Sequence, residues 1–251
     1  MKNRLEKLNK DLSRLTVLQR IQFIAGKFDR VVFTSSLGME DQVLTWAIAK
    51  NRAGSKIPDN IRIITLQTGR LFPETIELIK TTSEHFGLEI IELTPDRQDS
   101  EDYVQKYGLN GFYESVQARK ACCHFRKIAP LEKGLNGADA WITGLRADQS
   151  EYRNATEFAQ WDEKLSLVKF SPLADFSMGQ IVELVERNDI PVNPLHKRNY
   201  PSIGCEPCTR AIKPGEDERA GRWWWEQNQN QECGLHEPQA LSKNLSAQVT
   251  P

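Results

Sequence analysis

Apolar residues recur every three or four positions at the start of the chain and then gather in short runs. Residues 5–27 have helical spacing, which predicts one amphipathic helix or a pair of them. The residues that carry this spacing are Leu5, Leu8, Leu12, Leu15, Leu18, Ile21 and Ile24. The later runs are short and mostly apolar, and they predict strands. They lie at residues 31–34, 61–66, 88–93, 140–143 and 165–170.

Helical patterns separate the predicted strands. Pro73 marks the first turn of a helix that runs to about Phe86, and a further helix covers about 177–188. Strands that alternate with helices predict an α/β fold with a mostly parallel, doubly wound sheet. Ligands of such sheets bind beyond the carboxyl ends of the strands. The loops that leave strands at that end are 35–40, 67–70 and 144–149.

The length of 251 residues fits one domain of this class. We expect a core over about 28–212, a functional C-terminal segment over about 213–236, and a polar, disordered tail at 237–251. Between the third and fourth strands, 99–135 is typical of a helix, a Gly-rich break and a basic helix. After Ile190 the chain becomes Pro-rich, which excludes a long regular element there.

Charge and hydropathy exclude several classes of protein. A formal net charge of −1 argues against bulk binding to nucleic acid. No apolar run reaches the roughly 20 residues that span a bilayer. Residues 1–15 lack the apolar core of a signal peptide, so we expect a cytoplasmic protein. Five cysteines, an odd number in a reducing compartment, speak against a disulfide framework and for metal binding or catalysis.

Four cysteines fall into two pairs, Cys122-Cys123 and Cys205-x-x-Cys208, and the second pair has the spacing of a metal or cluster clamp. Neighbouring residues on a helix point about 100° apart, so both thiolates of the first pair reach one tetrahedral ion only with backbone strain. A cubane cluster presents several irons to separate ligands. The pattern favours a 4Fe–4S cluster and leaves zinc or unligated thiols as alternatives. The basic residues that would offset the cluster charge, or form a solvated helix face, are Arg119, Lys120, Arg126 and Lys127.

The fifth cysteine, Cys233, stands in a polar stretch and is followed by Gly234-Leu235-His236. A thiolate is the reactive form of cysteine, and nearby cations such as His236 lower the pKa of the thiol. The position favours a thiol kept free to react over an incidental exposed one. A thiol near the end of a chain is also able to move between a site and a second partner.

Small and polar residues in the loops after the strands indicate an anion site. Ser35, Ser36 and Gly38 would offer hydroxyl and N–H groups to phosphate oxygens, although such a turn also suits a plain strand–helix connection. The stretches Thr68-Gly69-Arg70 and Gly144-Leu145-Arg146 place an arginine at the same edge of the sheet.

More arginines follow near the C-terminus. Arg219 and Arg222 are one helical turn apart and therefore on one face. Clustered arginines suit bidentate contacts to a substrate with several anionic oxygens. The next residues, Trp223, Trp224 and Trp225, either stack on a base or, for at least two of them, pack in the core.

Seven stretches of the chain together resemble the bacterial assimilatory adenylyl-sulfate (adenosine 5′-phosphosulfate, APS) reductases, in the group that includes the 3′-phosphoadenylyl-sulfate (PAPS) reductases. They span about 30–236 and read SSLGMEDQVL, LQTGRLFPET, KACCHFRKIAPL, TGLRADQS, GCEPCTR, ERAGRWWWE and ECGLH. The resemblance implies an adenine nucleotide alpha hydrolase-like fold. It also implies reduction of APS to sulfite and AMP through an S-sulfocysteine, in sulfate assimilation for cysteine biosynthesis. Thioredoxin, or a similar dithiol protein, would be the electron donor.

The resemblance assigns roles to individual residues. Cys233 matches the catalytic cysteine, and Lys127 would lie near both cluster and substrate. The matched ligands of one 4Fe–4S cluster per subunit are Cys122, Cys123, Cys205 and Cys208. The residues implied to bind substrate are Ser35, Ser36, Gly38, Leu66, Gly69, Lys127, Arg146, Arg219, Arg222 and His236. The chain departs from the family at Gln67, where an aspartate is usual, and at Ala147, where a second basic residue is common.

Other interpretations stay open. The cluster cysteines imply a preference for APS, with reduction of PAPS as the alternative. An ATP-dependent adenylating enzyme of the pyrophosphate-loop class typically carries an SGGxDS loop, whereas 35–40 lacks the paired glycines. A redox sensor with a cluster or zinc would bind metal without turnover. We expect no nucleic-acid or membrane partner, and the sequence leaves the oligomeric state open, a homo-oligomer included.

Overall fold

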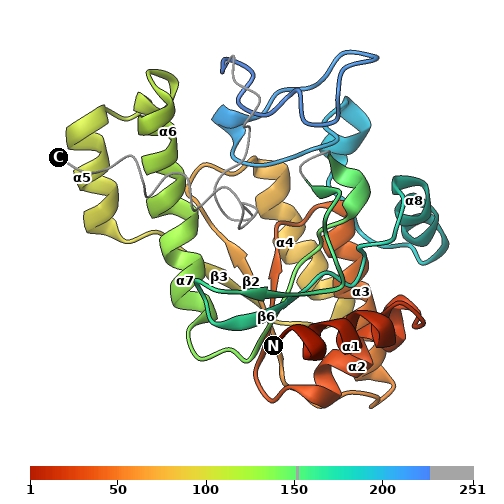
Figure 1. Cartoon of the computed structure of the whole chain (residues 1–251). Helices are drawn as coiled ribbons and strands as arrows, with labels where there is room; N and C mark the ends of the chain where they lie inside the picture. The colour runs from red at the N-terminus through yellow and green to blue at the C-terminus, as the bar shows by residue number, and fades with distance from the viewer. Residues whose placement is uncertain (151–152, 227–251) are drawn as a thin grey trace.

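The computed structural model of the protein describes residues 1–150 and 153–226, and a six-stranded sheet forms its centre (Figure 1). The strands are β1 (Val31–Ser35), β2 (Ile61–Leu66), β3 (Ile90–Leu93), β4 (Ala140–Ile142), β5 (Ala159–Asp162) and β6 (Leu167–Phe170). Their spatial order is β3-β2-β1-β4-β6-β5. Every pair is parallel except β5 with β6. The predicted α/β fold with a mostly parallel sheet is therefore confirmed.

Eight α-helices accompany the sheet in the described residues. They are α1 (Lys2–Leu12), α2 (Val17–Lys27), α3 (Met39–Ala53), α4 (Pro73–Phe86), α5 (Arg97–Tyr107), α6 (Val116–Cys123), α7 (Ala129–Leu135) and α8 (Met178–Arg187). The N-terminal pattern forms a pair of helices because Thr16 starts the second with a reciprocal capping box to Gln19. Pro73 opens α4, as predicted, because the first turn of a helix needs no proline N–H.

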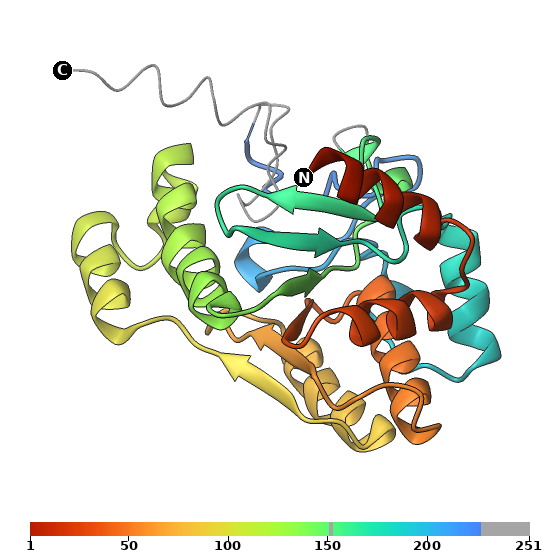
Figure 2. The ribbon, with the colours of Figure 1, turned by 60° about the horizontal axis from the view of Figure 1, so that its bottom comes forward.

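The alternation of side chains along the strands gives the sheet two apolar faces. Val31 and Phe33 of β1 are buried in the larger core cluster, together with residues of α1, α2, α3 and α8. Val32 points the other way and packs with Leu131 and Leu135 of α7. Figure 2 shows the sheet from a direction in which helices lie on both sides of it. The parallel strands lie between these helices and have their carboxyl ends at the same edge of the sheet, which we call the rim.

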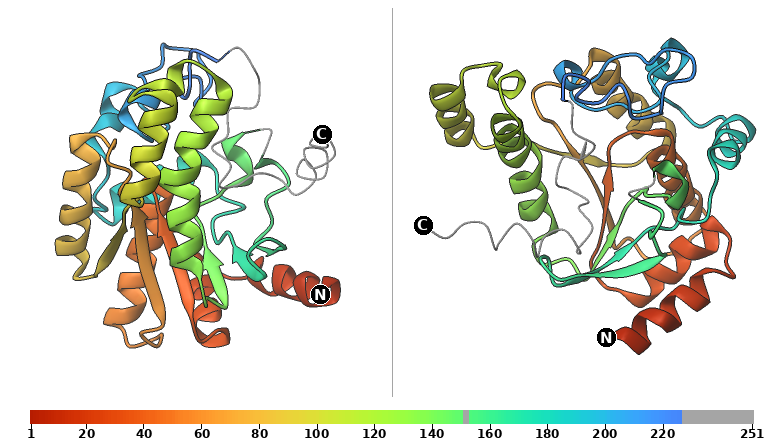
Figure 3. Two further views of the ribbon diagram at one scale, coloured as in Figure 1. Left: turned by 90° about the vertical axis from the view of Figure 1, so that its left-hand side faces the viewer. Right: turned by 45° about the horizontal axis from the view of Figure 1, so that its top comes forward.

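Two parts of the chain gather at this rim. Helices α5 and α6 stand on one side, and the segment that follows α8 crosses above the strand ends (Figure 3). That segment contains only short 3-10 turns, η5 (Pro194–Arg198) and η6 (Glu206–Cys208), among the described residues. The prediction of no long element after Ile190 is confirmed for this part of the chain. The expected tail at 237–251 lies outside the described residues.

Strand β5 was absent from the prediction. Its sequence, AQWD, is half polar, and it lies at the sheet edge, where burial imposes a weaker apolar pattern. In the described ranges, no helix has both the length and the apolar character needed to cross a membrane.

Candidate active site

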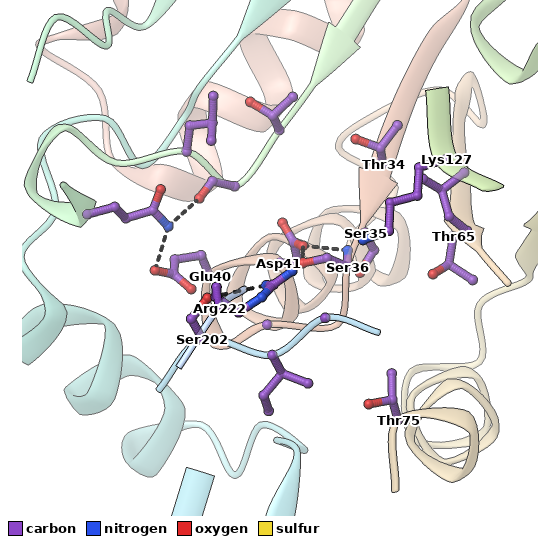
Figure 4. Close-up of a pocket in the computed structure, with 18 of the residues that line it drawn as sticks. Thr34, Ser35, Ser36, Glu40, Asp41, Thr65, Thr75, Lys127, Ser202 and Arg222 are labelled. Atoms are coloured by element: carbon purple, nitrogen blue, oxygen red, sulfur yellow. Dashed lines mark hydrogen bonds between the residues drawn. The ribbon is translucent and has the colours of Figure 1, made fainter. Parts of the chain in front are cut away.

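A cavity of about 240 Å³ opens beyond the carboxyl ends of β1, β2 and β4. The chain runs from β1 outward through β2 to β3 and then returns to the other side of β1 as β4, so the cavity lies where the strand order reverses. Doubly wound sheets bind their ligands at this place. The polar residues that line the cavity include Thr34, Ser36, Glu40, Thr65, Lys127, Ser202 and Arg222 (Figure 4). Because the sequence resemblance described above implies a nucleotide substrate, we call it the nucleotide cavity below.

The loop after β1 is organised by Asp41, in the first turn of α3. Both the backbone N–H and the hydroxyl of Ser36 donate to Asp41 Oδ2, at 2.6 and 2.7 Å. Leu37, which has φ of 62°, donates its N–H to Ser35 Oγ at 3.1 Å. Two donors that we expected to bind phosphate are thus directed at an acidic side chain. Burial raises the pKa of Asp41 to about 6, against the lowering effect of the Ser36 hydrogen bonds.

The loop after β4 places its two arginines differently. Arg146 is fully buried and is not among the described residues that line the nucleotide cavity. Its Nε donates to Glu40 Oε1 at 2.9 Å, and Gln149 Nε2 donates to the same oxygen at 2.8 Å. Arg153, which the sequence prediction omitted, does line the cavity and donates from Nη1 to Gln149 Oε1 at 2.6 Å. The available signal was a second arginine seven positions beyond Arg146, just past the loop boundary that we expected.

Three further cations line the cavity: Lys127, Arg219 and Arg222. Arg219 and Arg222 do not lie on a helix, because the chain makes a turn in which Arg222 N–H donates to Arg219 C=O at 2.8 Å. The turn still brings both side chains to the cavity. Gly204 permits this arrangement, since a Cβ there would lie 2.2 Å from Arg222 Nη2. Leu66 also lines the cavity, whereas Gly69 does not.

A second, smaller cavity lies beside the first and is lined by all four paired cysteines. We call it the four-cysteine cavity. Cys122 and Cys123 end α6, and the five-residue π-helix η2 (His124–Ile128) follows them. Cys205 immediately precedes η6 and Cys208 is its last residue. This turn is tied to the loop after β2 by the Glu206 N–H, which donates to Arg70 C=O at 2.7 Å. Two segments far apart in sequence thus meet at the thiols.

Cations and thiols shape the electrostatics of this cavity. Burial raises the pKa of Cys208 to about 12, and the neighbouring Cys205 and Cys123 add to the rise. Burial also raises the pKa of Cys205, but Lys127, the Thr68 hydroxyl and Arg222 together bring it below its ordinary value. Thr68 Oγ1 lies 3.3 Å from Cys205 Sγ. The lining cations are Arg70, Arg119, Arg126, Lys127 and Arg222. Lys120 is exposed and is not among the described lining residues.

Three residues line both cavities: Lys127, Arg222 and Trp223. Trp223 is 1% exposed, and the guanidinium carbons of Arg119 and Arg222 lie 4.7 and 4.8 Å from the centre of its ring. Trp224 is 41% exposed, and Trp225 is half-buried. Trp223 belongs to the buried cluster around the cysteines and Trp225 packs against that cluster, so two of the three tryptophans pack in this core as expected, and Trp224 does not.

The structure brings together most of the residues named from the sequence. Those lining the nucleotide cavity are Ser35, Ser36, Gly38, Leu66, Lys127, Arg219 and Arg222. Cys233 and His236 lie outside the described residues. In the described part of the chain, no three histidine, cysteine or acidic side chains are arranged to hold a single metal ion.

The chain is similar in sequence to known reductases over most of its length. The family of phosphoadenosine phosphosulfate reductase domains matches residues 30–211. An adenosine 5′-phosphosulfate reductase of Agrobacterium fabrum (strain C58) is 57% identical over 91% of this chain and 86% of its own length. A protein of the same name from Allochromatium vinosum is 47% identical over 92% of this chain and 88% of its own.

Solved structures confirm the predicted fold. A phosphoadenylyl-sulfate reductase from Candida auris, in a phosphate complex, matches with a TM-score of 0.71 at 21% identity, over 84% of this chain and 98% of that one. An FMN adenylyltransferase from Candida glabrata, in complex with FAD and pyrophosphate, matches with a TM-score of 0.54 at 13% identity, over 95% and 82%. At such identities the likeness shows the shared adenine nucleotide alpha hydrolase-like fold.

Proposed function

Because the chain belongs to the phosphoadenosine phosphosulfate reductase family, we propose that this enzyme reduces adenylyl sulfate to sulfite and AMP. The substrate follows from the relatives named adenosine 5′-phosphosulfate reductase. One observation carries the proposal: a cavity at the strand switch point shares Lys127, Arg222 and Trp223 with a cavity lined by four cysteines. The proposed nucleotide site and the proposed cluster site therefore adjoin each other and share these three side chains.

The nucleotide cavity suits a nucleotide with a phosphosulfate group. Lys127, Arg153, Arg219 and Arg222 line it and supply cations for the phosphate and sulfate oxygens. Leu66 and Leu131 give it apolar wall area of the kind that nucleoside sites use. We infer that these cations hold the anionic end of the substrate and counter charge on the departing AMP.

The four-cysteine cavity suits a 4Fe–4S cluster. All four thiols line it, and five cationic side chains around them would balance the negative charge of a thiolate-bound cluster. We propose that Cys122, Cys123, Cys205 and Cys208 hold one such cluster. When bound, it supplies an iron–sulfide group of negative charge beside Lys127 and Arg222. Zinc bound by the same thiols is the alternative. Analysis of the metal content of the purified protein distinguishes the two, because a cluster brings iron and sulfide and the alternative brings zinc.

The covalent chemistry falls to Cys233. Its thiolate attacks the sulfur of the substrate, a sulfur–sulfur bond forms, and the bond from sulfur to the phosphate oxygen breaks, so AMP leaves with the electron pair. The cations of the nucleotide cavity stabilise the charge on that leaving group. A thiolate of thioredoxin, or of a similar dithiol protein, then attacks Cys233 Sγ and displaces sulfite. The donor's second thiol resolves the mixed disulfide, which restores Cys233 and leaves the donor oxidised.

Trapping the intermediate tests this function. Purified protein is incubated anaerobically with adenylyl sulfate and no thiol, then digested and examined by mass spectrometry. We expect the mass of one SO₃ unit on the peptide that contains Cys233, and release of sulfite when reduced thioredoxin is added. Cys233→Ser is the matched control and should bind AMP without forming sulfite. Modification of Cys122 or Cys208 instead would contradict the assignment of roles.

Two comparisons separate the proposal from its alternatives. Steady-state kinetics with APS and PAPS side by side decide between the two reductase activities, and we expect a higher kcat/KM for APS. An assay for exchange between pyrophosphate and ATP tests the adenylating alternative that shares this fold. Exchange without sulfite formation would contradict the reductase proposal.

A further inference from the structure

A buried ion pair holds the last described residue of the chain. Arg119 lies on α6, three positions before Cys122, and its side chain is 1% exposed. Its Nη2 donates to Glu226 Oε2 at 3.0 Å, and its Nε donates to Glu226 Oε1. The Glu226 side chain is only 6% exposed. The contact is therefore bidentate and shielded from water, and the two parallel hydrogen bonds fix the relative orientation of the two side chains.

The same arginine also interacts with two residues that line the four-cysteine cavity, Trp223 and Cys123. Its guanidinium carbon lies 4.7 Å from the ring centre of Trp223, and it is within hydrogen-bonding reach of Cys123. The turn that leads to Glu226 is closed by the Glu226 N–H, which donates to Trp223 C=O at 2.9 Å. Arg119 thus fixes Glu226 relative to the cysteine pair on α6.

Two features show that this turn is held in place by its surroundings. Trp223 has φ of 46°, a conformation that a bulky residue adopts only when the surrounding structure imposes it. A buried ion pair also contributes little net stability, because the cost of removing both charges from water offsets their attraction. Stability alone therefore accounts poorly for either feature, whereas a requirement for position accounts for both.

We propose that the Arg119–Glu226 ion pair is a positioning device that fixes residue 226, from which the chain continues to Cys233, relative to the four-cysteine cavity. This inference rests on the proposed function, in which Cys233 accepts the sulfo group. Cys233 follows Glu226 by seven positions, and seven extended residues reach about 25 Å at most. A fixed starting point raises the effective concentration of the thiol at the nucleotide cavity.

The test is Glu226→Ala in the full-length protein, carried with its bound iron. We expect the single-turnover rate of S-sulfocysteine formation to fall on the order of tenfold to a hundredfold, as misplacement of a reacting group does. The dissociation constant of AMP, the iron content and the visible absorption should match the unaltered protein. The loss should thus appear in kcat, with KM for adenylyl sulfate little changed.

Glu216→Ala is the matched control. Glu216 pairs with Arg210 at 2.8 Å in the same segment, and neither residue lines either cavity among the described residues. We expect this variant to transfer the sulfo group at the unaltered rate. Glu226→Asp keeps the charge on a shorter side chain and should fall between the unaltered protein and Glu226→Ala.

The outcomes separate the two proposals. If the unaltered protein forms S-sulfocysteine at Cys233 and Glu226→Ala forms it within twofold of the same rate, the positioning role is wrong while the function stands. If Glu226→Ala and Glu226→Asp both lose their iron, the pair serves the cofactor cavity and the inference also fails. If the unaltered protein never modifies Cys233, it is the proposed function that fails.

Discussion

The four-cysteine cavity and the nucleotide cavity share a wall, yet they are built in different ways. The first is formed mainly by two compact stretches, 119–127 and 205–208, with unusual residue types. The second is assembled from the ends of three strands and from the distant segment 201–223. A site formed by rare residue types at close spacing can therefore be recognised in the sequence. A site formed by the ends of several strands becomes apparent only in the three-dimensional structure.

The two cavities also differ in charge. Among the residues that the structure describes, every charged side chain that lines the four-cysteine cavity, cysteines apart, is a cation. The nucleotide cavity mixes cations with Glu40, Asp41 and Glu218. Two of these acids are engaged within the protein, because Glu40 accepts from Arg146 and Asp41 accepts from Ser36. A permanent anionic group suits the first environment, and an exchangeable nucleotide suits the second.

The largest effect should come from replacing a cysteine that is proposed to bind the cluster or the cysteine that is proposed as the nucleophile. Cys208→Ser should lose most of the bound iron and its sulfite formation together, because an incomplete ligand set cannot retain the cluster. Cys233→Ser should keep its iron and lose at least about a thousandfold in turnover, the scale seen when a nucleophile is removed. Iron analysis and a sulfite assay on both variants check this. A Cys208→Ser protein that keeps four irons would contradict the ligand assignment.

A smaller effect should distinguish the arginines of the two cavities. Arg222→Ala removes a cation from both, and Arg153→Ala removes one from the nucleotide cavity alone among the described linings. Each should raise the dissociation constant of adenylyl sulfate about 10- to 100-fold, since a charge-assisted hydrogen bond contributes about 1.5–3 kcal/mol. Only Arg222→Ala should also shift the visible absorption of the bound cofactor. Arg187→Ala, on the exposed face of α8, is the control and should change neither.

The smallest effect concerns Asp41 and pH. Burial raises the pKa of this carboxyl to about 6 in the folded protein, above its ordinary value near 4 in the unfolded chain. The folded state therefore binds the proton more tightly, and the contribution of Asp41 to stability increases as pH falls from 7 to 5. Linkage gives about 1 kcal/mol over that interval, which Asp41→Asn should remove. Urea unfolding of the unaltered protein and of Asp41→Asn at pH 7 and pH 5 checks this. If the free energy of unfolding changes by the same amount between the two pH values in both proteins, the raised pKa of Asp41 is wrong.

The sequence predicted the fold wherever burial enforced a pattern. Pro73 and Phe86 bound α4 as expected, because proline suits the first turn and a left-handed glycine follows the last. Strand β5 escaped prediction because an edge strand needs no continuous apolar run. Apolar runs therefore predicted even the other edge strand, β3, whereas β5 is defined by its pairing with β6, which its own short sequence does not show.

The candidate site was predicted in part for the same reason. The cysteine pairs were found by spacing alone, and the structure places all four in one cavity. The cation set was less complete, since Arg146 pairs with Glu40 while Arg153 lines the cavity. Two arginines on one loop look alike in sequence. Which of them reaches a cavity depends on the acids that the rest of the fold brings near.

The π-helix η2 constrains the number of residues between Cys123 and α7 as well as the path of the backbone between them. It joins the cysteines at the end of α6 to α7, which packs under the sheet through Leu131 and Leu135. Deleting one residue within it would close the wide turn to an α-turn and rotate α6 by about 100° against α7. Cys122 and Cys123 would then face away from Cys205. The length of this short stretch should therefore matter as much as its side chains, of which Lys127 lines both cavities.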